Sequence, residues 1–407
     1  MALLNPLSNA FGLDIGDRTF KLVQVKRRLR GKNPYRITAW NTVDVPEGVM
    51  ERGDIKDMDK AVEHLTRLIR TVKGSLYGRA VVACLPEAKT FIKIIEAPNG
   101  STEEDLRRAV LTEIEQNIPL PPEDIYFDWQ VLESEERPAE PEKQKTKAAE
   151  SDAKKTDAGP AAKGAEEQPQ PAEEAAPQAN DTMKVLMGAA PKTLVDDYTA
   201  MLESAGLAPV ALEIEATAIS RAIVPANEPI DEAIGILDIG ATRSSLVIYD
   251  GGALRMSISI PISGIAITRL VSESLSVSVE DAELLKRECG LDSTRCEDKM
   301  WKILLPLIDD MTEKIRNALR FYKIGFPSGK KIERLYLCGG GAQFREIDTV
   351  LSRKLTIKAR RGDALTNIDA KIPREFPTKE EALGYATAIG LAMRAADENV
   401  KNKNSFS

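Results

Sequence analysis

The sequence predicts an α/β protein with two similar lobes, and three glycine-containing turns carry this prediction. Residues 12–16 form an apolar segment that ends in Asp-Ile-Gly, and residues 236–240 repeat this ending in the other half of the chain. Each is followed by a short polar turn and a second apolar segment, which is typical of a β-hairpin. A third turn, at 339–341, consists of three glycines after another apolar segment. Two matching hairpins and a later glycine turn predict two lobes that hold a nucleotide between them.

The first half of the chain alternates between strands and helices. A hairpin is expected at 11–26, and the strand at 80–85 ends at a proline. The helix at 102–117 begins with the capping sequence Ser-Thr-Glu-Glu. The other expected elements are helices at 57–72, 191–205 and 215–223, and strands at 35–45, 90–96, 125–132, 183–190 and 210–214.

The second half repeats this plan. A long helical pattern covers 298–322 and contains Pro306, a residue that can kink a helix. Strands followed by crossover helices in both halves favour an α/β architecture. The other expected elements are strands at 233–239, 244–249, 254–260 and 331–337, and helices at 264–275, 279–288, 343–354 and 379–395.

Residues 133–182 differ in composition from the rest of the chain. They contain no Val, Ile, Leu, Met or aromatic residue, and their 13 acidic and 7 basic residues give a net charge of −6. Such a segment cannot bury enough apolar surface to fold, so we expect a disordered loop inside a strand hairpin. The whole chain carries −7, which leaves −1 for the remainder. No nucleic-acid binding is expected, because the remainder has no excess of positive charge.

Other features narrow the class of protein. The length of 407 residues predicts two or more domains. No apolar run is long enough to span a bilayer and the N-terminus lacks a signal peptide, so we expect a cytoplasmic protein without direct membrane insertion. Cys84, Cys289, Cys296 and Cys338 lack zinc-site spacing and are expected to be reduced, buried thiols. The single histidine, His64, excludes a histidine-dependent triad and is expected at the surface.

The two Asp-Ile-Gly turns suit phosphate binding. Gly16 and Gly240 leave backbone N–H groups open to phosphate oxygens, because no Cβ stands in the way. Asp14 and Asp238 can hold Mg²⁺ through its water shell, and the cation is needed because bare carboxylates would repel a triphosphate. The other expected contacts are Lys21 and Thr242 to phosphate, and Gly339, Gly340 and Gly341 to the sugar and base.

The order of these motifs resembles the actin/Hsp70/sugar-kinase superfamily. Within it, the chain is most similar to the PilM-type component of type IV pilus assembly, a family related to FtsA. The resemblance runs nearly from end to end and is carried by AVVACLP at 80–86, EIEQNIPLPPED at 113–124, LEIEATAISRA at 212–222, DAELLK at 281–286 and ALGYATAIG at 382–390.

This resemblance implies an actin-like fold of two ribonuclease-H-like lobes, with a small α+β domain inserted in the first. It also implies ATP with Mg²⁺ between the lobes. The implied boundaries are 1–85 for the first lobe, completed by 208–230 and 382–396, then 86–207 for the inserted domain, 231–381 for the second lobe and 397–407 for a flexible tail.

The resemblance further implies a scaffold role at the inner membrane. Proteins of this type bind the N-terminal cytoplasmic peptide of a PilN-type inner-membrane protein, near the junction of the first lobe and the inserted domain. Their complex works alongside the pilus motor ATPases. The chain is therefore expected to associate with the membrane only through a protein partner.

The roles implied for single residues follow from their positions. Glu215 lies where the superfamily often positions the attacking water, although the helix dipole also favours a carboxylate at a helix N-terminus. Glu283 and Lys286 lie on the helix that flanks the adenosine. The implied phosphate loops contain Gly16, Thr19 and Lys21 in the first lobe and Asp238, Gly240 and Thr242 in the second, and the adenosine loop contains Gly339, Gly340 and Gly341.

Asp17 departs from the family pattern, which has a small hydroxyl residue at this position. A carboxylate near the γ-phosphate would repel it unless Arg18, Lys21 or Mg²⁺ compensates. Alternatively, Asp17 points away and the turn uses only backbone donors. Slow hydrolysis, or binding of ATP without turnover, is therefore an open alternative.

Three other function classes are weighed against the scaffold. A sugar-kinase-type enzyme needs a catalytic aspartate in a substrate lobe, and the sequence offers no convincing one. An Hsp70-like chaperone needs a substrate-binding region after residue 395. An FtsA-like cell-division protein needs an amphipathic C-terminal helix, which 398–407 does not resemble.

Overall fold

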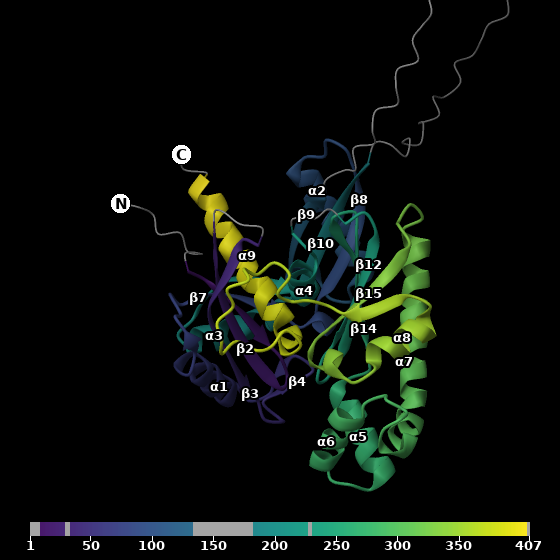
Figure 1. Cartoon of the computed structure of the whole chain (residues 1–407). Coiled ribbons are helices and arrows are strands. Elements are labelled where there is room, and N and C mark those ends of the chain that lie inside the picture. Colours follow the sequence, from purple (N-terminus) through teal and green to yellow (C-terminus); the bar gives the residue numbers. More distant parts are fainter. Residues whose placement is uncertain (1–8, 29–32, 133–181, 227–229, 405–407) are drawn as a thin grey trace, which may run out of the picture.

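The computed structural model describes residues 9–28, 33–132, 182–226 and 230–404, and Figure 1 shows their arrangement. Two mixed sheets form the centres of two lobes, and a three-stranded sheet belongs to a smaller unit between them at one end. The predicted α/β class with two similar lobes is confirmed. The disorder predicted for 133–182 falls, except for Thr182, outside the described residues.

The sheet of the first lobe is built around the first Asp-Ile-Gly turn. Its antiparallel strands β3, β2 and β1 continue into the parallel strands β7 and β11, and the short β6 lies at the edge beside β3. Asp14 on β1 pairs with Lys21 on β2. The strands are β1 (Phe11–Ile15), β2 (Thr19–Arg27), β3 (Tyr35–Asp44), β6 (Lys73–Gly74), β7 (Ala80–Leu85) and β11 (Ala208–Ile214).

The sheet of the second lobe has the same topology. Antiparallel β14, β13 and β12 continue into parallel β15 and β16, so the two sheets match strand for strand except for β6. Asp238 pairs with Ser245, at the position equivalent to the pair of Asp14 and Lys21. The strands are β12 (Ala233–Ile239), β13 (Ser244–Asp250), β14 (Ala253–Ile260), β15 (Ile332–Cys338) and β16 (Lys358–Arg361).

Helices α4 (Glu215–Ile223) and α9 (Ala386–Asn404) join the two lobes. Helix α9 packs against β1 and β2 of the first lobe and against α4, which also contacts β13 and β14 of the second lobe. The crossing of the two helices is close, because a Cβ on Gly390 would lie only 1.8 Å from the carbonyl oxygen of Ala218. The apolar core is therefore continuous from one lobe through α4 and α9 to the other.

Helices α1 and α3 pack on the first sheet, α7 and α8 pack on the second, and α5 and α6 form a pair at one end of the second lobe (Figure 1). In the first lobe, Phe11 and Leu13 of β1 pack against Leu65 of α1 and Tyr198 of α3. The N-cap residue Asp57 begins α1 by accepting a hydrogen bond from the backbone N–H of Lys60. The helices are α1 (Met58–Arg70) and α3 (Lys192–Ser204) in the first lobe, and α5 (Gly264–Leu275), α6 (Val279–Cys289), α7 (Lys299–Gly325) and α8 (Ile347–Leu355) in the second.

The small inserted unit consists of the three-stranded sheet and one helix. β10 lies between β8 and β9 and is antiparallel to both, and Lys184 pairs with Leu132 across the interrupted hairpin. Thr102 and Asp105 form a reciprocal capping box at the start of the helix. Helix α3 falls inside the range 86–207 but packs in the core of the first lobe. The elements are β8 (Phe91–Pro98), α2 (Glu103–Asn117), β9 (Ile125–Leu132) and β10 (Thr182–Pro191).

Near the end of the chain, one predicted helix is shifted in the structure and one strand was missed. The helix expected at 379–395 begins only at Ala386, because residues 381–385 form a 3₁₀ turn, and it continues to Asn404 into the expected tail. The edge strand β16 was not predicted. It has four residues, of which three are basic, so its sequence lacks the apolar alternation of a strand.

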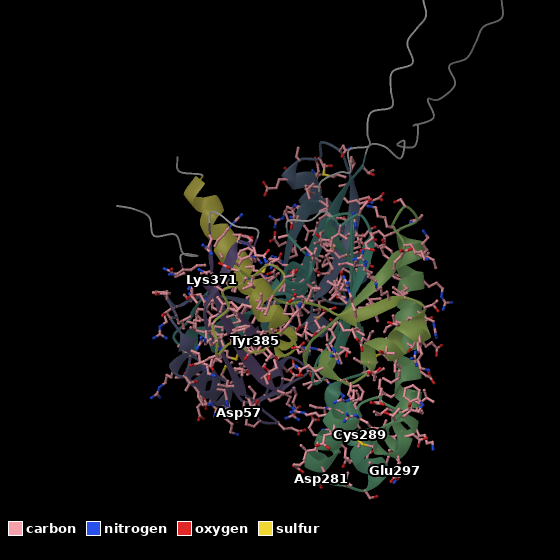
Figure 2. The ribbon with its side chains drawn as sticks, in the orientation of Figure 1. Asp57, Asp281, Cys289, Glu297, Lys371 and Tyr385 are labelled. Carbon is pink, nitrogen blue, oxygen red and sulfur yellow. A yellow bond between two sulfur atoms is a disulfide. The ribbon has the colours of Figure 1, made fainter. Side chains whose placement is uncertain are left out.

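The predictions for cysteine and histidine are wrong in part. Cys289 and Cys296 form a disulfide with a Cα–Cα distance of 5.9 Å, because the end of α6 folds back on the following turn (Figure 2). Cys84 and Cys338 are free and buried, as predicted. His64 is buried rather than exposed, and its Nδ1 lies 2.6 Å from Nη2 of Arg67. The buried stripe of α1 is therefore wider than the spacing of its apolar residues indicated.

Candidate functional site: the cavity between the lobes

The two Asp-Ile-Gly turns have the same backbone geometry. The N–H of Gly16 donates to the carbonyl oxygen of Thr19 at 3.1 Å, and the N–H of Gly240 donates to that of Arg243 at 2.9 Å. A Cβ on Gly16 would lie 3.0 Å from the Thr19 oxygen, and a Cβ on Gly240 would lie 2.6 Å from the Arg243 oxygen. Both turns therefore favour a residue without a side chain. The N–H groups of the two glycines are used inside the turns, so they are not open to phosphate oxygens as the sequence predicted.

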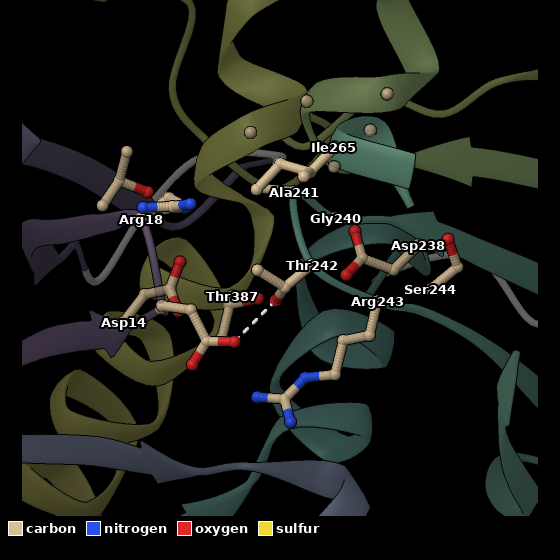
Figure 3. A pocket seen from close by; sticks show the side chains of 18 of the residues that line it. Asp14, Arg18, Asp238, Gly240, Ala241, Thr242, Arg243, Ser244, Ile265 and Thr387 are labelled. Atoms are coloured by element: carbon tan, nitrogen blue, oxygen red, sulfur yellow. Dashed lines mark hydrogen bonds between the residues drawn. The ribbon is translucent and has the colours of Figure 1, made fainter. Parts of the chain in front are cut away.

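Both turns face one cavity between the lobes (Figure 3). Its volume of about 1060 Å³ is at the upper end of the range of about 300–1,000 Å³ that small-molecule sites occupy. Residues that are far apart in the sequence meet here. Every predicted nucleotide-site residue lines the cavity: Asp14, Gly16, Thr19, Lys21, Glu215, Asp238, Gly240, Thr242, Glu283, Lys286, Gly339, Gly340 and Gly341.

Three carboxylates approach one another at this cavity. Burial, together with the charge of Asp14, raises the pKa of Asp238 to about 6. Burial and the charges of Asp238 and Asp14 raise the pKa of Glu215 well above its ordinary value. A partial counter-charge comes from Lys21, whose Nζ lies 3.5 Å from Oδ2 of Asp14. An added cation would relieve this repulsion, which is the environment that a divalent metal ion prefers.

The third glycine turn is fitted tightly against the second Asp-Ile-Gly turn. Gly339 has φ +77°, and a Cβ there would lie 2.2 Å from Oδ1 of Asp238. A Cβ on Gly341 would lie 2.2 Å from Cγ2 of Ile239. The turn thus brings bare backbone to the cavity beside Asp238.

Helix α6 contributes Glu283 and Lys286 to the same wall, but their charged groups bind each other. Glu283 accepts hydrogen bonds from Lys286 and from Thr268 of α5, at 2.6 Å for the latter. Burial raises the pKa of Glu283, but these hydrogen bonds outweigh it and the pKa is lowered. Lys286 also donates to the carbonyl oxygen of Gly264 at 3.2 Å. The pair fixes α6 against the start of α5.

Asp17 lines the same cavity, and its carboxylate is held by hydrogen bonds from both lobes. Its carboxylate accepts hydrogen bonds from the backbone N–H groups of Arg52 and Gly53 at 3.1 and 2.9 Å. It also accepts one from the hydroxyl of Thr242 at 2.7 Å, which is the dashed line in Figure 3. The hydroxyl expected to face phosphate is therefore bound to the first lobe, and this hydrogen bond joins the two turns.

Sequence reasoning missed Arg243 and Glu87, which line the same cavity. Burial raises the pKa of Glu87, whose Oε2 has no hydrogen-bond partner within the described part of the chain. A signal for Arg243 existed, since it directly follows Thr242 in the second turn. No comparable signal existed for Glu87, because only the fold brings it near the second lobe, where it contacts the hydroxyl of Ser257.

The described residues contain neither a membrane-spanning helix nor a metal-binding group of side chains. None of their helices is long and apolar enough to cross a membrane. Within the same residues, no group of three or more His, Cys, Asp or Glu side chains is arranged to hold a metal ion by itself.

Two lobes of equivalent topology, joined by two helices and separated by a cavity, define an actin-like protein. A sequence profile of the family described as Type IV pilus assembly protein PilM matches residues 12–158 and 173–396. The chain belongs to this family.

The chain is also similar to solved structures. The structure is similar to a solved PilM-PilN type IV pilus biogenesis complex, with a TM-score of 0.73, 23% identity, and coverage of 95% of this chain and 98% of that chain. It also matches the ethanolamine utilization protein EutJ from Carboxydothermus hydrogenoformans, with a TM-score of 0.49, 14% identity, and coverage of 94% and 89%.

A curated relative matches over a shorter stretch. The cell division protein FtsA of Neisseria meningitidis serogroup B (strain ATCC BAA-335 / MC58) is 28% identical over 122 residues. This match covers 30% of the present chain and 29% of that protein.

Proposed function

We propose that the protein binds ATP with Mg²⁺ in the cavity between its lobes. The observation that carries this proposal is that two equivalent glycine turns face one cavity. One turn is closed by the hydrogen bond of Gly16 to Thr19 and the other by that of Gly240 to Arg243. Successive backbone N–H groups in such turns form a concave site for anions. Two of these sites, one on each lobe, suit the phosphate chain of a nucleotide.

The donor set fits a magnesium ion held together with the nucleotide. Asp14 and Asp238 supply oxygen ligands, and their mutual repulsion would be relieved by a divalent cation. The described residues hold no metal cage of their own, which agrees with the habit of Mg²⁺ to keep waters and phosphate oxygens as ligands. The cation would neutralise phosphate charge beside these carboxylates.

The adenosine would lie against Gly339, Gly340 and Gly341, with the pair of Glu283 and Lys286 lining the same cavity. Bare backbone at the three glycines leaves room for a flat group. Glu215 is the residue in position to orient a water molecule. Burial and the charges of Asp238 and Asp14 raise its pKa, which disfavours the ionised form that would accept a proton from water and so favours slow turnover over rapid hydrolysis.

Equilibrium dialysis with labelled ATP and Mg²⁺ tests the nucleotide proposal. Wild-type protein should bind ATP, and Asp238→Ala should bind it at least about tenfold more weakly, because a metal ligand is lost. Asp196→Ala, which changes an exposed aspartate on α3, is the control and should bind like wild type. Binding that is absent in wild type, or unchanged in Asp238→Ala, would contradict the proposal.

We further propose that the protein is a scaffold of type IV pilus assembly that docks the N-terminal cytoplasmic peptide of a PilN-type inner-membrane protein. A second cavity, of about 520 Å³, supports this part of the proposal. It lies at the junction of the first lobe and the inserted unit, between β9 and β10 on one side and β11 and α9 on the other. Its apolar walls include Trp129, Leu212 and Ile214.

Docking at this junction would place the protein at the inner membrane through its partner, near the pilus motor ATPases. Tyr126 lines the cavity and its residue surface is 47% exposed, so it is available to a peptide. Tyr77, which is 44% exposed, lies outside that cavity and provides a matched control.

Fluorescence anisotropy with a labelled PilN-type N-terminal peptide tests the docking proposal. Wild type and Tyr77→Ala should bind with a micromolar or tighter constant, and Tyr126→Ala should bind about tenfold more weakly, as expected for an aromatic contact residue. A wild-type affinity equal to that for a scrambled peptide would overturn the partner. Equal losses in both tyrosine variants would overturn the location.

A further inference from the structure

Arg243 extends from the second glycine turn of one lobe toward the other lobe. Its Nη1 lies 3.6 Å from the position that a Cβ on Gly53 would take, and its charge acts on Tyr198 and Cys84, all three in the first lobe. Figure 3 shows its guanidinium separated from Ala241 and Ile265, with Thr242 in between. The side chain therefore spans the gap between the lobes.

The guanidinium lacks an acceptor that its burial requires. Nη1 is closed to solvent and has no hydrogen-bond partner within the described ranges of the chain. The carboxylates of Glu215 and Asp17 act on its charge, but neither makes a hydrogen bond to this nitrogen. Buried donors are nearly always paired in folded proteins, so an unpaired buried N–H on a side chain that lines the cavity indicates a place for an anionic or polar ligand.

The unpaired N–H of Arg243 lies away from the part of the cavity that we assign to the adenosine. Lys286 binds the carbonyl oxygen of Gly264, and the next residue, Ile265, donates its backbone N–H to Ala241 at 2.9 Å. α6 and the start of α5 therefore lie at the end of the turn marked by Ala241 and Ile265. Arg243 lies at the other end of the same turn, beyond the phosphate-binding backbone (Figure 3).

We propose that Arg243 binds the terminal phosphate of ATP and makes the cavity distinguish ATP from ADP. The inference rests on the proposed nucleotide function. A planar guanidinium with a free N–H gives a charge-assisted hydrogen bond to a phosphate oxygen. A diphosphate held by the same turns ends before this donor, so only the third phosphate gains the contact.

Asp17 links the proposed contact between Arg243 and phosphate to the first lobe. Its carboxylate binds Thr242, the neighbour of Arg243, and is anchored on Arg52 and Gly53 of the first lobe. A terminal phosphate at Arg243 adds a negative charge beside this carboxylate. The third phosphate would thus bind at the point where the two turns are joined. The positive charge of Arg243 would offset the repulsion between this phosphate and the carboxylate of Asp17.

Titration calorimetry with AMP-PNP and with ADP, both with Mg²⁺, tests the inference. Arg243→Gln should weaken AMP-PNP at least about tenfold and leave ADP within about twofold, because a charged hydrogen bond to one phosphate is lost. Arg243→Lys should lie in between, since it keeps the charge but loses the planar fork. Arg320→Gln, on the exposed face of α7, should match wild type for both ligands.

Each alternative result has a defined meaning. Equal losses for AMP-PNP and ADP in Arg243→Gln, or no loss, would overturn the role of Arg243 while wild-type binding still supports the nucleotide proposal. If Arg243→Gln fails to fold by circular dichroism, the ratio of the two affinities in Arg243→Lys decides in the same way. Wild-type protein that binds neither ligand would overturn both proposals.

Discussion

At the scale of single residues, the cavity is an acidic site in which charges are crowded. Asp14, Asp238 and Glu215 come from three different elements and meet only in the folded chain. Lys21 offsets Asp14 at 3.5 Å, but Asp238 lies in the other lobe and accepts a hydrogen bond from the thiol of Cys338 at 3.6 Å. The folded protein therefore carries an unfavourable charge arrangement that a cation-bound ligand would relieve.

This crowding predicts a pH-dependent effect of Asp238→Asn in magnesium-free buffer. Because the pKa of Asp238 is raised to about 6, the folded chain holds this proton more tightly than the unfolded chain. Its stabilising contribution is complete below pH ~4, the unfolded pKa, and is lost as the pH rises through 6. The asparagine cannot ionise, so the variant should gain stability over wild type, on the order of 2 kcal/mol at pH 8.

Urea unfolding at pH values from 4 to 8 measures this difference. The free energy of unfolding of Asp238→Asn minus that of wild type should increase between pH ~4 and ~7 and then level off. Gly384→Ala, a change that adds or removes no titratable group, should give a difference that does not change with pH. A flat difference for Asp238→Asn as well would show that Asp238 ionises normally in the folded chain.

The sequence predicted which residues line the site but not how their side chains are used. Spacing alone gives the backbone turns at Gly16 and Gly240, because a glycine requirement is local. The orientation of Asp17 depends on the N–H groups of Arg52 and Gly53, which only the fold brings near. Arg243 acquires its position in the same way, from first-lobe groups that are distant in the sequence.

At the scale of elements, the crossing of α4 and α9 holds the lobes together. The two helices can approach closely only because residue 390 has no side chain, since a Cβ there would overlap the carbonyl group of Ala218. The same requirement occurs where α9 passes β1, because a Cβ on Gly12 would lie 2.3 Å from the carbonyl oxygen of Ala388. Small residues therefore set the distance between the connecting helices and the first sheet.

Gly390→Ala should destabilise the protein by about 1–3 kcal/mol, because the added methyl group forces α4 and α9 apart in a packed core. Gly384→Ala is the control, since a Cβ there meets no atom within 4 Å. The free energy of unfolding in urea gives both values. Equal values for the two variants would mean that the crossing is looser than described.

The hairpin of β9 and β10 predicts that the segment between its strands can be replaced. Since Lys184 pairs with Leu132, a short turn can connect the two strands in the same register. A variant with Asn-Gly in place of residues 133–181 should fold and bind ATP within about twofold of wild type, because loop-closure entropy changes little. A loss of ATP binding beyond tenfold would show that the segment contributes to the cavity.

The elements predicted from the sequence were those with a strong local pattern. The repeated hairpins, α2 with its capping box and the long α7 follow from apolar spacing and caps. β16 was missed because tertiary pairing with β15, rather than its own sequence, makes Lys358–Arg361 a strand. The disulfide of Cys289 and Cys296 was missed because its geometry depends on how the chain folds back after α6.

At the scale of the whole molecule, the duplicated topology explains why one ligand would involve both lobes. Each lobe presents one Asp-Ile-Gly turn to the cavity, and the second lobe adds the turn at 339–341. The lobes contact each other at several points, which include the hydrogen bond of Thr242 to Asp17 and the ion pair of Arg269 with Glu47 near the cavity, and they are also joined by α4 and α9. A ligand that binds both turns would therefore couple nucleotide binding to the relative position of the lobes, and so to the second cavity at the inserted unit.

A crystal structure of the protein with AMP-PNP and Mg²⁺ tests the central claim most directly. We expect the phosphates between Gly16 and Gly240, the metal ion beside Asp14 and Asp238, and the base against the glycines of 339–341. Density for the nucleotide at another place, or an empty cavity at a saturating concentration of nucleotide, would contradict it.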